Sequence, residues 1–117
     1  MAVKFIDLND SYKIKTATED IIVDVQIGDG QVGAYSIFLG QKFISANTPA
    51  NLDKKANVKG KSTIVSVTVA DVLEETNWTS MTVFVKEDES KTTYGPYKAL
   101  AENHLDTVIF SLKLINE

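Results

Sequence analysis

One histidine, sixteen carboxylates and a few aromatic rings are the residues of this chain that could do chemistry. His104 is the sole histidine, and the chain has no cysteine and no arginine. A serine triad needs an imidazole beside a serine, yet no Gly-x-Ser-x-Gly elbow surrounds any serine. Metal centres built on histidine or cysteine need two or more such ligands. We therefore predict no catalysis by His104, no transition-metal site and no cofactor.

The carboxylates leave one enzymatic alternative open. Nine aspartates and seven glutamates are present, and a glycosidase needs two carboxyl groups at a suitable separation in a cleft. Most of these residues fall on expected turns and solvent-facing strand positions, and no spacing matches a known calcium loop. We predict that the protein is not an enzyme and holds no metal. Hydrolysis by a carboxylate pair is the minority alternative.

Aromatic side chains are better candidates for ligand binding. Trp78 follows Asn77 in a polar break, and Tyr94 and Tyr97 flank a Gly-Pro pair. Exposed rings stack on sugars or anchor proteins, because they offer a large contact area at little entropic cost. Asn77, Trp78, Tyr94 and Tyr97 thus form a candidate carbohydrate-binding site. In the structural alternative, Trp78 caps one end of a core and the tyrosines cover a sheet edge.

Alternation of apolar and polar residues predicts the elements that must position these side chains. The alternation is clearest in residues 63–69 and 108–114, and a period of two is that of a strand with one buried face. No segment keeps a helical period over three turns, and one helical turn is expected at residues 99–103. We expect nine strands, at residues 3–6, 12–16, 20–28, 34–39, 42–45, 62–72, 80–87, 92–98 and 107–115.

Turn residues predict how these strands connect. Gly28, Asp29 and Gly30 predict a hairpin between the third and fourth strands, and Gly40-Gln41 predicts a two-residue turn before the fifth. Pro96 lacks a backbone N–H, so its strand is expected at an edge or with a bulge. Residues 46–61 lose the alternation. We interpret them as a crossover between two sheets, with a functional loop as the alternative.

The predicted fold class is therefore all-β. We expect a two-sheet antiparallel β-sandwich, immunoglobulin-like or jelly-roll, with Greek-key connectivity through residues 46–61. At 117 residues the chain is long enough for one core and short for two. Residues 1–117 are thus expected to form a single β-sandwich domain.

Charge and composition narrow the expected partners and compartment. The net charge is −4 and arginine is absent, whereas nucleic acids and anionic membranes call for a positive field. We predict neither as a partner. Residues 1–10 do not resemble a signal peptide, and the absence of cysteine suits a reducing compartment, so the cytoplasm is favoured over export. Residues 46–61 carry four lysines and one aspartate, giving +3; this basic loop either orients a partner or keeps the loop soluble.

Four apolar residues fall out of phase with the buried faces of their expected strands. They are Phe38, Ile64, Phe84 and Ile109. Apolar residues on a solvent-facing side mark an interface when they gather into a patch. Our leading hypothesis is a non-enzymatic interaction or assembly module that binds protein, or a second copy of itself, through these residues and through sheet edges. A carbohydrate-binding module is the alternative.

Overall fold

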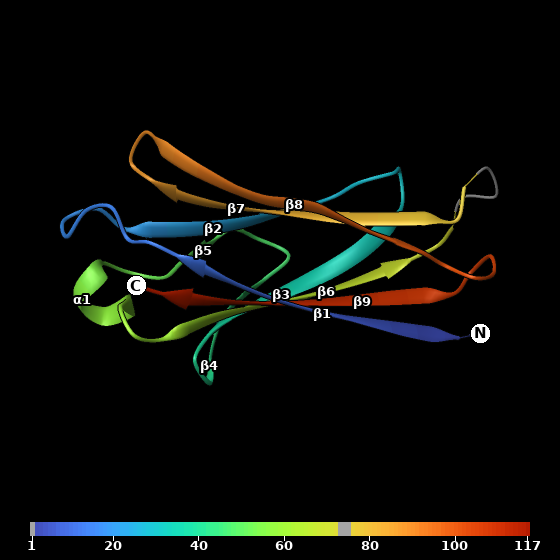
Figure 1. The fold of residues 1–117 in the computed structure, drawn as a ribbon, viewed down its shortest axis with the longest axis horizontal. Helices are drawn as coiled ribbons and strands as arrows, with labels where there is room; N and C mark the ends of the chain where they lie inside the picture. Colours follow the sequence, from blue (N-terminus) through green and yellow to red (C-terminus); the bar gives the residue numbers. More distant parts are fainter. Residues whose placement is uncertain (1, 73–75) are drawn as a thin grey trace.

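The computed structural model describes residues 2–72 and 76–117 and consists of two β-sheets packed face to face (Figure 1). Its elements are β1 (Val3–Tyr12), β2 (Ile21–Ile27), β3 (Val32–Leu39), β4 (Lys42–Ala46), β5 (Ala50–Asn51), α1 (Lys55–Val58), β6 (Ser62–Ala70), β7 (Trp78–Glu87), β8 (Ser90–Leu100) and β9 (Thr107–Asn116). One sheet has the order β1-β9-β6-β3-β4 and the other β5-β2-β7-β8. The predicted all-β sandwich is confirmed.

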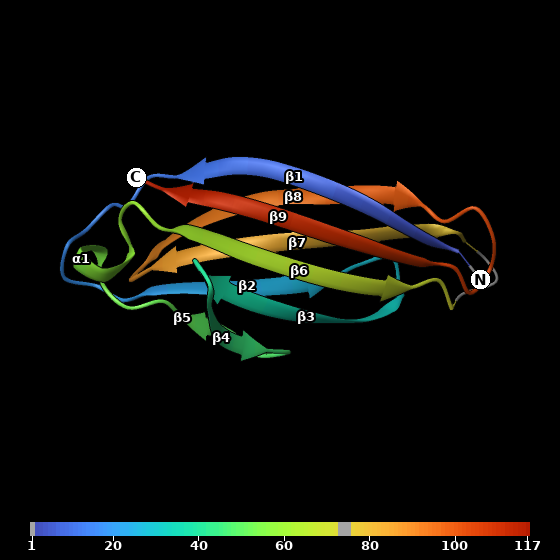
Figure 2. The ribbon, with the colours of Figure 1, turned by 90° about the horizontal axis from the view of Figure 1, so that it is seen from below.

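Strand pairing within the sheets is antiparallel with one exception. β1 runs parallel to β9, which places the first and last strands side by side at one edge of the five-stranded sheet (Figure 2). The two strands expected at residues 3–6 and 12–16 are in fact the single strand β1. The chain leaves the sheet after Ile14, whose N–H still donates to the Glu117 carbonyl at 2.9 Å. The N–H groups of Lys15 and Thr16 donate instead to the Glu87 carboxylate, at 2.9 and 3.3 Å.

The glycine-rich segment after β2 is a corner between the sheets, so the expected hairpin there is wrong. β2 pairs with β5 and β7, whereas β3 pairs with β4 and β6. Asp29 and Gly30 do have the positive φ expected of turn residues. The Gly28 N–H, however, donates to the Ser80 carbonyl of β7 at 3.1 Å. Turn chemistry predicts that the chain reverses, but it does not say which sheet receives the returning strand.

Residues 46–61 cross between the sheets as expected, and they do so twice. The chain passes from β4 in one sheet to β5 in the other and returns to β6. Leu52 and Val58, 3% and 0% exposed, anchor this connection in the core. The helical turn expected at residues 99–103 is absent, because β8 continues to Leu100 and the Ala101 N–H donates to the Asn77 carbonyl at 2.8 Å.

The core lies between the sheets and is built by the alternation that predicted the strands. Inward-facing residues of β6 and β9, such as Val67 and Phe110, are fully buried, while their neighbours in sequence are partly or fully exposed. The Gly40-Gln41 turn joins β3 to β4 as expected. The expectation for Pro96 is also confirmed, because β8 is an edge strand and its register with β7 shifts between Met81 and Val83.

Tyr94 closes the edge of the sandwich where β8 and β1 approach each other. Its ring is 8% exposed, and its hydroxyl donates to the Ser11 carbonyl of β1 at 2.8 Å. Burial of the phenol, reinforced by the charge of Asp10, raises the pKa of Tyr94 from its ordinary value of 10.0 to about 12. The folded protein therefore favours the neutral phenol.

We expect this tyrosine to make the protein less stable in alkali. Above pH 10 the unfolded chain ionises while folded Tyr94 stays neutral, so its stabilising contribution is complete below pH 10 and is lost as the pH rises to about 12. Chemical denaturation at a series of pH values should show the free energy of unfolding falling through this window, with a shallower fall in Tyr94→Phe. Equal slopes for both proteins would contradict the prediction.

Candidate functional site

The outward side of the five-stranded sheet gathers most of the exposed apolar side chains. We call it the outer sheet face and define it by the outward positions of β1, β9, β6, β3 and β4; Figure 2 looks onto it. Because side chains alternate along a strand, every second residue of these strands points here. The large apolar residues on this face that are mainly exposed are Phe5 (69%), Val32 (61%), Phe43 (55%), Val3 (50%) and Ile115 (49%).

Strand register brings three of the four predicted interface residues onto this face. Ile109 lies beside Phe5 across the β1–β9 pair. Ile64 lies beside Phe38, which in turn pairs with Phe43. The Phe38 and Phe43 rings pack edge to face, with centroids 5.7 Å apart. Two apolar groups thus lie on one surface, built from residues that are far apart in the sequence.

The fourth predicted residue, Phe84, lies on the opposite side of the sandwich. It occupies β7 of the four-stranded sheet and points outward there, half-buried. The Lys91 ammonium lies 4.5 Å from the centre of the Phe84 ring, a cation–π contact that partly covers it. Phe84 was therefore correctly predicted to point outward, but it is not part of the outer sheet face.

The two outward surfaces of the sandwich differ in how many charged side chains they carry. On the outer sheet face, within the described strands, the charged side chains are Asp7 of β1 and Lys113 of β9. Serines, threonines and alanines fill the space between the apolar groups. The outward positions of β2, β7 and β8, by contrast, include Asp24, Lys86, Lys91 and Lys98. A broad, nearly uncharged surface on a small domain is characteristic of an interface.

Sequence reasoning missed Phe5, Val32 and Phe43 on this face. Phe5 lies in a strand whose alternation is weak, and Val32 precedes the strand that we expected to begin at residue 34. Phe43 points outward beside Phe38 because the two-residue Gly40-Gln41 turn pairs Leu39 with Lys42 and therefore Phe38 with Phe43. That turn was the available signal for Phe43. For Phe5 the signal was an aromatic residue in phase with Val3, and only its pairing with β9 gives it meaning.

The four predicted carbohydrate-binding residues do not share one surface. Trp78 is 46% exposed and points outward from β7, beside Leu100, which is 45% exposed. Asn77 is partly buried next to it. Tyr94 is buried, and Tyr97 is partly buried against the core. The tyrosines thus cover a sheet edge, as in the structural alternative, whereas Trp78 does not cap the core.

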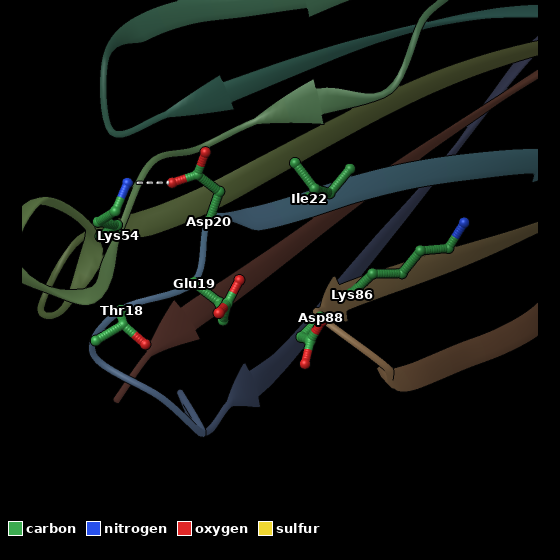
Figure 3. A pocket seen from close by; sticks show the side chains of 7 residues that line it. All are labelled: Thr18, Glu19, Asp20, Ile22, Lys54, Lys86 and Asp88. Carbon is green, nitrogen blue, oxygen red and sulfur yellow. Dashed lines mark hydrogen bonds and ion pairs between the residues drawn. The ribbon is translucent and has the colours of Figure 1, made fainter.

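A first recess lies between the start of β2 and the β7–β8 hairpin. It has a volume of about 440 Å³ and a wide mouth, and Figure 3 shows the side chains around it. The Lys54 ammonium contacts the Asp20 carboxylate at 2.7 Å. This hydrogen bond, with a second from Asn51, holds the pKa of Asp20 below its ordinary value. Glu19, Lys86 and Asp88 complete the charged rim without forming a closed cleft.

A second recess lies on the other side of the Asp20–Lys54 pair. We call it the lysine groove; its volume is about 590 Å³. Its walls come from β4, β5 and α1, together with the last residue of β3 and the last residue before β6. Lys42, Lys54 and Lys61 surround it. Two of these lysines belong to the basic loop of residues 46–61, which therefore forms part of a recess in addition to crossing between the sheets.

Metal ligands and catalytic groups do not converge in the described part of the chain. Within residues 2–72 and 76–117, no cluster of three or more histidine and carboxylate side chains could hold a metal ion. His104 is exposed in the loop between β8 and β9, as expected. No helix among these residues is long and apolar enough to cross a membrane.

Comparison of the chain with protein-family models, with curated proteins and with solved structures gave no match. Its function is inferred from its own geometry.

Proposed function

We propose that this protein is a non-enzymatic assembly module that binds a second copy of itself through the outer sheet face. The observation that carries the proposal is the concentration of exposed apolar side chains on one nearly uncharged sheet surface. Burying such side chains against a partner removes apolar area from water, at roughly 25 cal/mol per Å². Phe5, Phe38 and Phe43 supply the rigid rings typical of interface anchors.

The size of the outer sheet face suits a stable dimer. Five strands about 4.8 Å apart, and eight or nine residues at about 3.3 Å each, give an area of roughly 700 Å². A standard interface buries about 800 Å² on each partner. One copy of the face is therefore close to what a two-fold dimer requires, without any further surface.

The two charged residues on the face also favour a second copy as the occupant. Asp7 and Lys113 have opposite charges and lie on the neighbouring strands β1 and β9. In a two-fold arrangement each surface meets an identical one, so the two copies bring equal numbers of Asp7 and Lys113 side chains and the interface carries no net charge. A like-charged pair would have opposed such a dimer.

Sheet edges support an assembly role less well than this face. β4 and β5 are short, and β8 contains Pro96, which has no N–H to donate, beside a shift in its register with β7. The β1 edge is tied to β8 by two side-chain bonds: the Tyr94 hydroxyl donates to the Ser11 carbonyl, and the Lys4 ammonium donates to the Leu100 carbonyl. Short, interrupted or covered edges discourage strand addition.

Solution mass tests the proposal without any assumption about a ligand. Light scattering over a range of protein concentrations should give twice the 12.9 kDa mass of the chain, and high salt should leave the dimer intact because its interface is mainly apolar. A mass equal to that of one chain at every concentration up to the millimolar range would overturn self-association. A larger, concentration-dependent mass without a plateau would contradict a closed two-fold dimer.

A further inference from the structure

We propose that the lysine groove binds a small phosphomonoester whose phosphate lies between Lys42 and Lys61. This site is independent of the outer sheet face. Side chains alternate along β4, so Phe43 belongs to the face while Lys42 and Ile44 line the groove. The two sites therefore share a strand but use its opposite sides.

The carboxylates that line the groove are hydrogen-bonded within its wall, and Asp20 is also paired with a cation, Lys54. The two oxygens of Asp20 accept from the Lys54 ammonium at 2.7 Å and from the Asn51 amide at 3.0 Å. Those of Asp53 accept from the Lys54 main-chain N–H and from the Asn57 amide, both at 2.8 Å. Every carboxylate oxygen has a donor within the wall itself.

The charged side chains that line the groove are three lysines and two aspartates, a net charge of +1. Lys42 and Lys61 are exposed, and neither forms an ion pair with any residue in the described ranges. Their two ammonium groups are therefore available to the oxygens of a phosphomonoester, whose charge is close to −2 at neutral pH. Lysine binds phosphate as a point charge and needs no planar geometry, which suits a chain without arginine.

Three apolar side chains contribute to a lining that is otherwise polar, and they give an organic phosphate a contact that the free ion lacks. They are Leu39 and Leu52, 8% and 3% exposed, and Ile44, which is partly buried. A volume of about 590 Å³ lies within the range of small-molecule sites, roughly 300–1,000 Å³. The groove thus offers lysines for the phosphate and three apolar side chains for the ester group.

An NMR titration with phenyl phosphate tests this site. We expect the amide signals of Lys42, Asn51, Asn57 and Lys61 to shift together and to saturate in the millimolar range. Inorganic phosphate should bind more weakly, because it has no ester group to contact Leu39, Ile44 and Leu52. Phenol, which lacks the charge, should leave these signals unchanged. Equal binding of phenyl phosphate and inorganic phosphate would overturn the ester preference in favour of a site for free phosphate.

Two matched double variants separate a specific site from general attraction of anions. Lys42→Gln with Lys61→Gln should weaken phenyl phosphate binding about tenfold or more. Lys91→Gln with Lys98→Gln removes the same charge from β8, at two lysines that line neither recess, and should change the affinity less than twofold. Equal losses in both variants, or shifts that do not centre on the groove, would overturn the proposal. Neither result bears on dimerisation, which light scattering measures separately.

Discussion

Phe5→Lys is expected to convert the proposed dimer into a monomer. Phe5 is 69% exposed, beside Ile109 on the outer sheet face, so the substitution costs the single chain little. In the dimer it places a charge at a buried anchor position. Hot-spot residues contribute on the order of 2 kcal/mol or more, and a two-fold dimer contains each residue twice, so the dissociation constant should rise roughly a thousandfold. Light scattering or sedimentation measures the change directly.

Trp78→Lys provides the matched control for this experiment. Trp78 is another exposed aromatic residue, 46% accessible, but it points outward from the opposite sheet. We expect its substitution to leave the dimer intact. Dissociation by Trp78→Lys but not by Phe5→Lys would place the interface on the four-stranded sheet. Phe84 and Trp78 would then be the candidate interface residues.

Glu87→Ala is expected to cause a large loss of stability. The Glu87 side chain is 1% exposed and accepts from the Tyr12 hydroxyl and from the main-chain N–H groups of Lys15 and Thr16. Removing the carboxylate leaves three donors without their acceptor. Leaving the buried Tyr12 hydroxyl without its acceptor costs about 1–3 kcal/mol, and losing the two main-chain hydrogen bonds costs about 1 kcal/mol each. Together these losses lower the melting temperature of a chain of this length on the order of 10–20 °C.

Two further variants make the Glu87 experiment interpretable. Glu89→Ala removes a carboxylate from the exposed tip of the same hairpin and should change the free energy of unfolding by less than about 0.5 kcal/mol. Glu87→Gln keeps a carbonyl acceptor and should lose less stability than Glu87→Ala, so it supplies a measurable value if the alanine variant does not fold. A Glu87→Ala protein as stable as Glu89→Ala would contradict the role assigned to this network.

The role of Glu87 also bears on the enzymatic alternative from the sequence. A catalytic carboxylate must lie in a cleft within reach of substrate. Glu87 is buried and anchors the connection between β1 and β2, and both Asp20 and Asp53 hold parts of the lysine groove together. These three carboxylates therefore have structural partners within the fold.

Part of the candidate site could be predicted from the sequence because outward direction is a local property. Phe38, Ile64 and Ile109 break the alternation of their own strands, and each indeed points away from the core. The same reasoning treated Phe84 as equivalent to them. Whether two outward residues share a surface depends on which sheet holds each strand, and no local pattern carries that information.

The sequence by itself determined the positions of most strands, the Gly40-Gln41 turn, the irregularity at Pro96 and the two-sheet fold class, because alternation and turn chemistry act over a few residues. The tertiary structure alone decided the parallel pairing of β1 with β9, the passage of the Gly28 corner between sheets, and the assembly of the outer sheet face and lysine groove. These features rest on contacts between residues distant in the chain. Their energies depend on register and burial, which become defined only when the whole sandwich has formed.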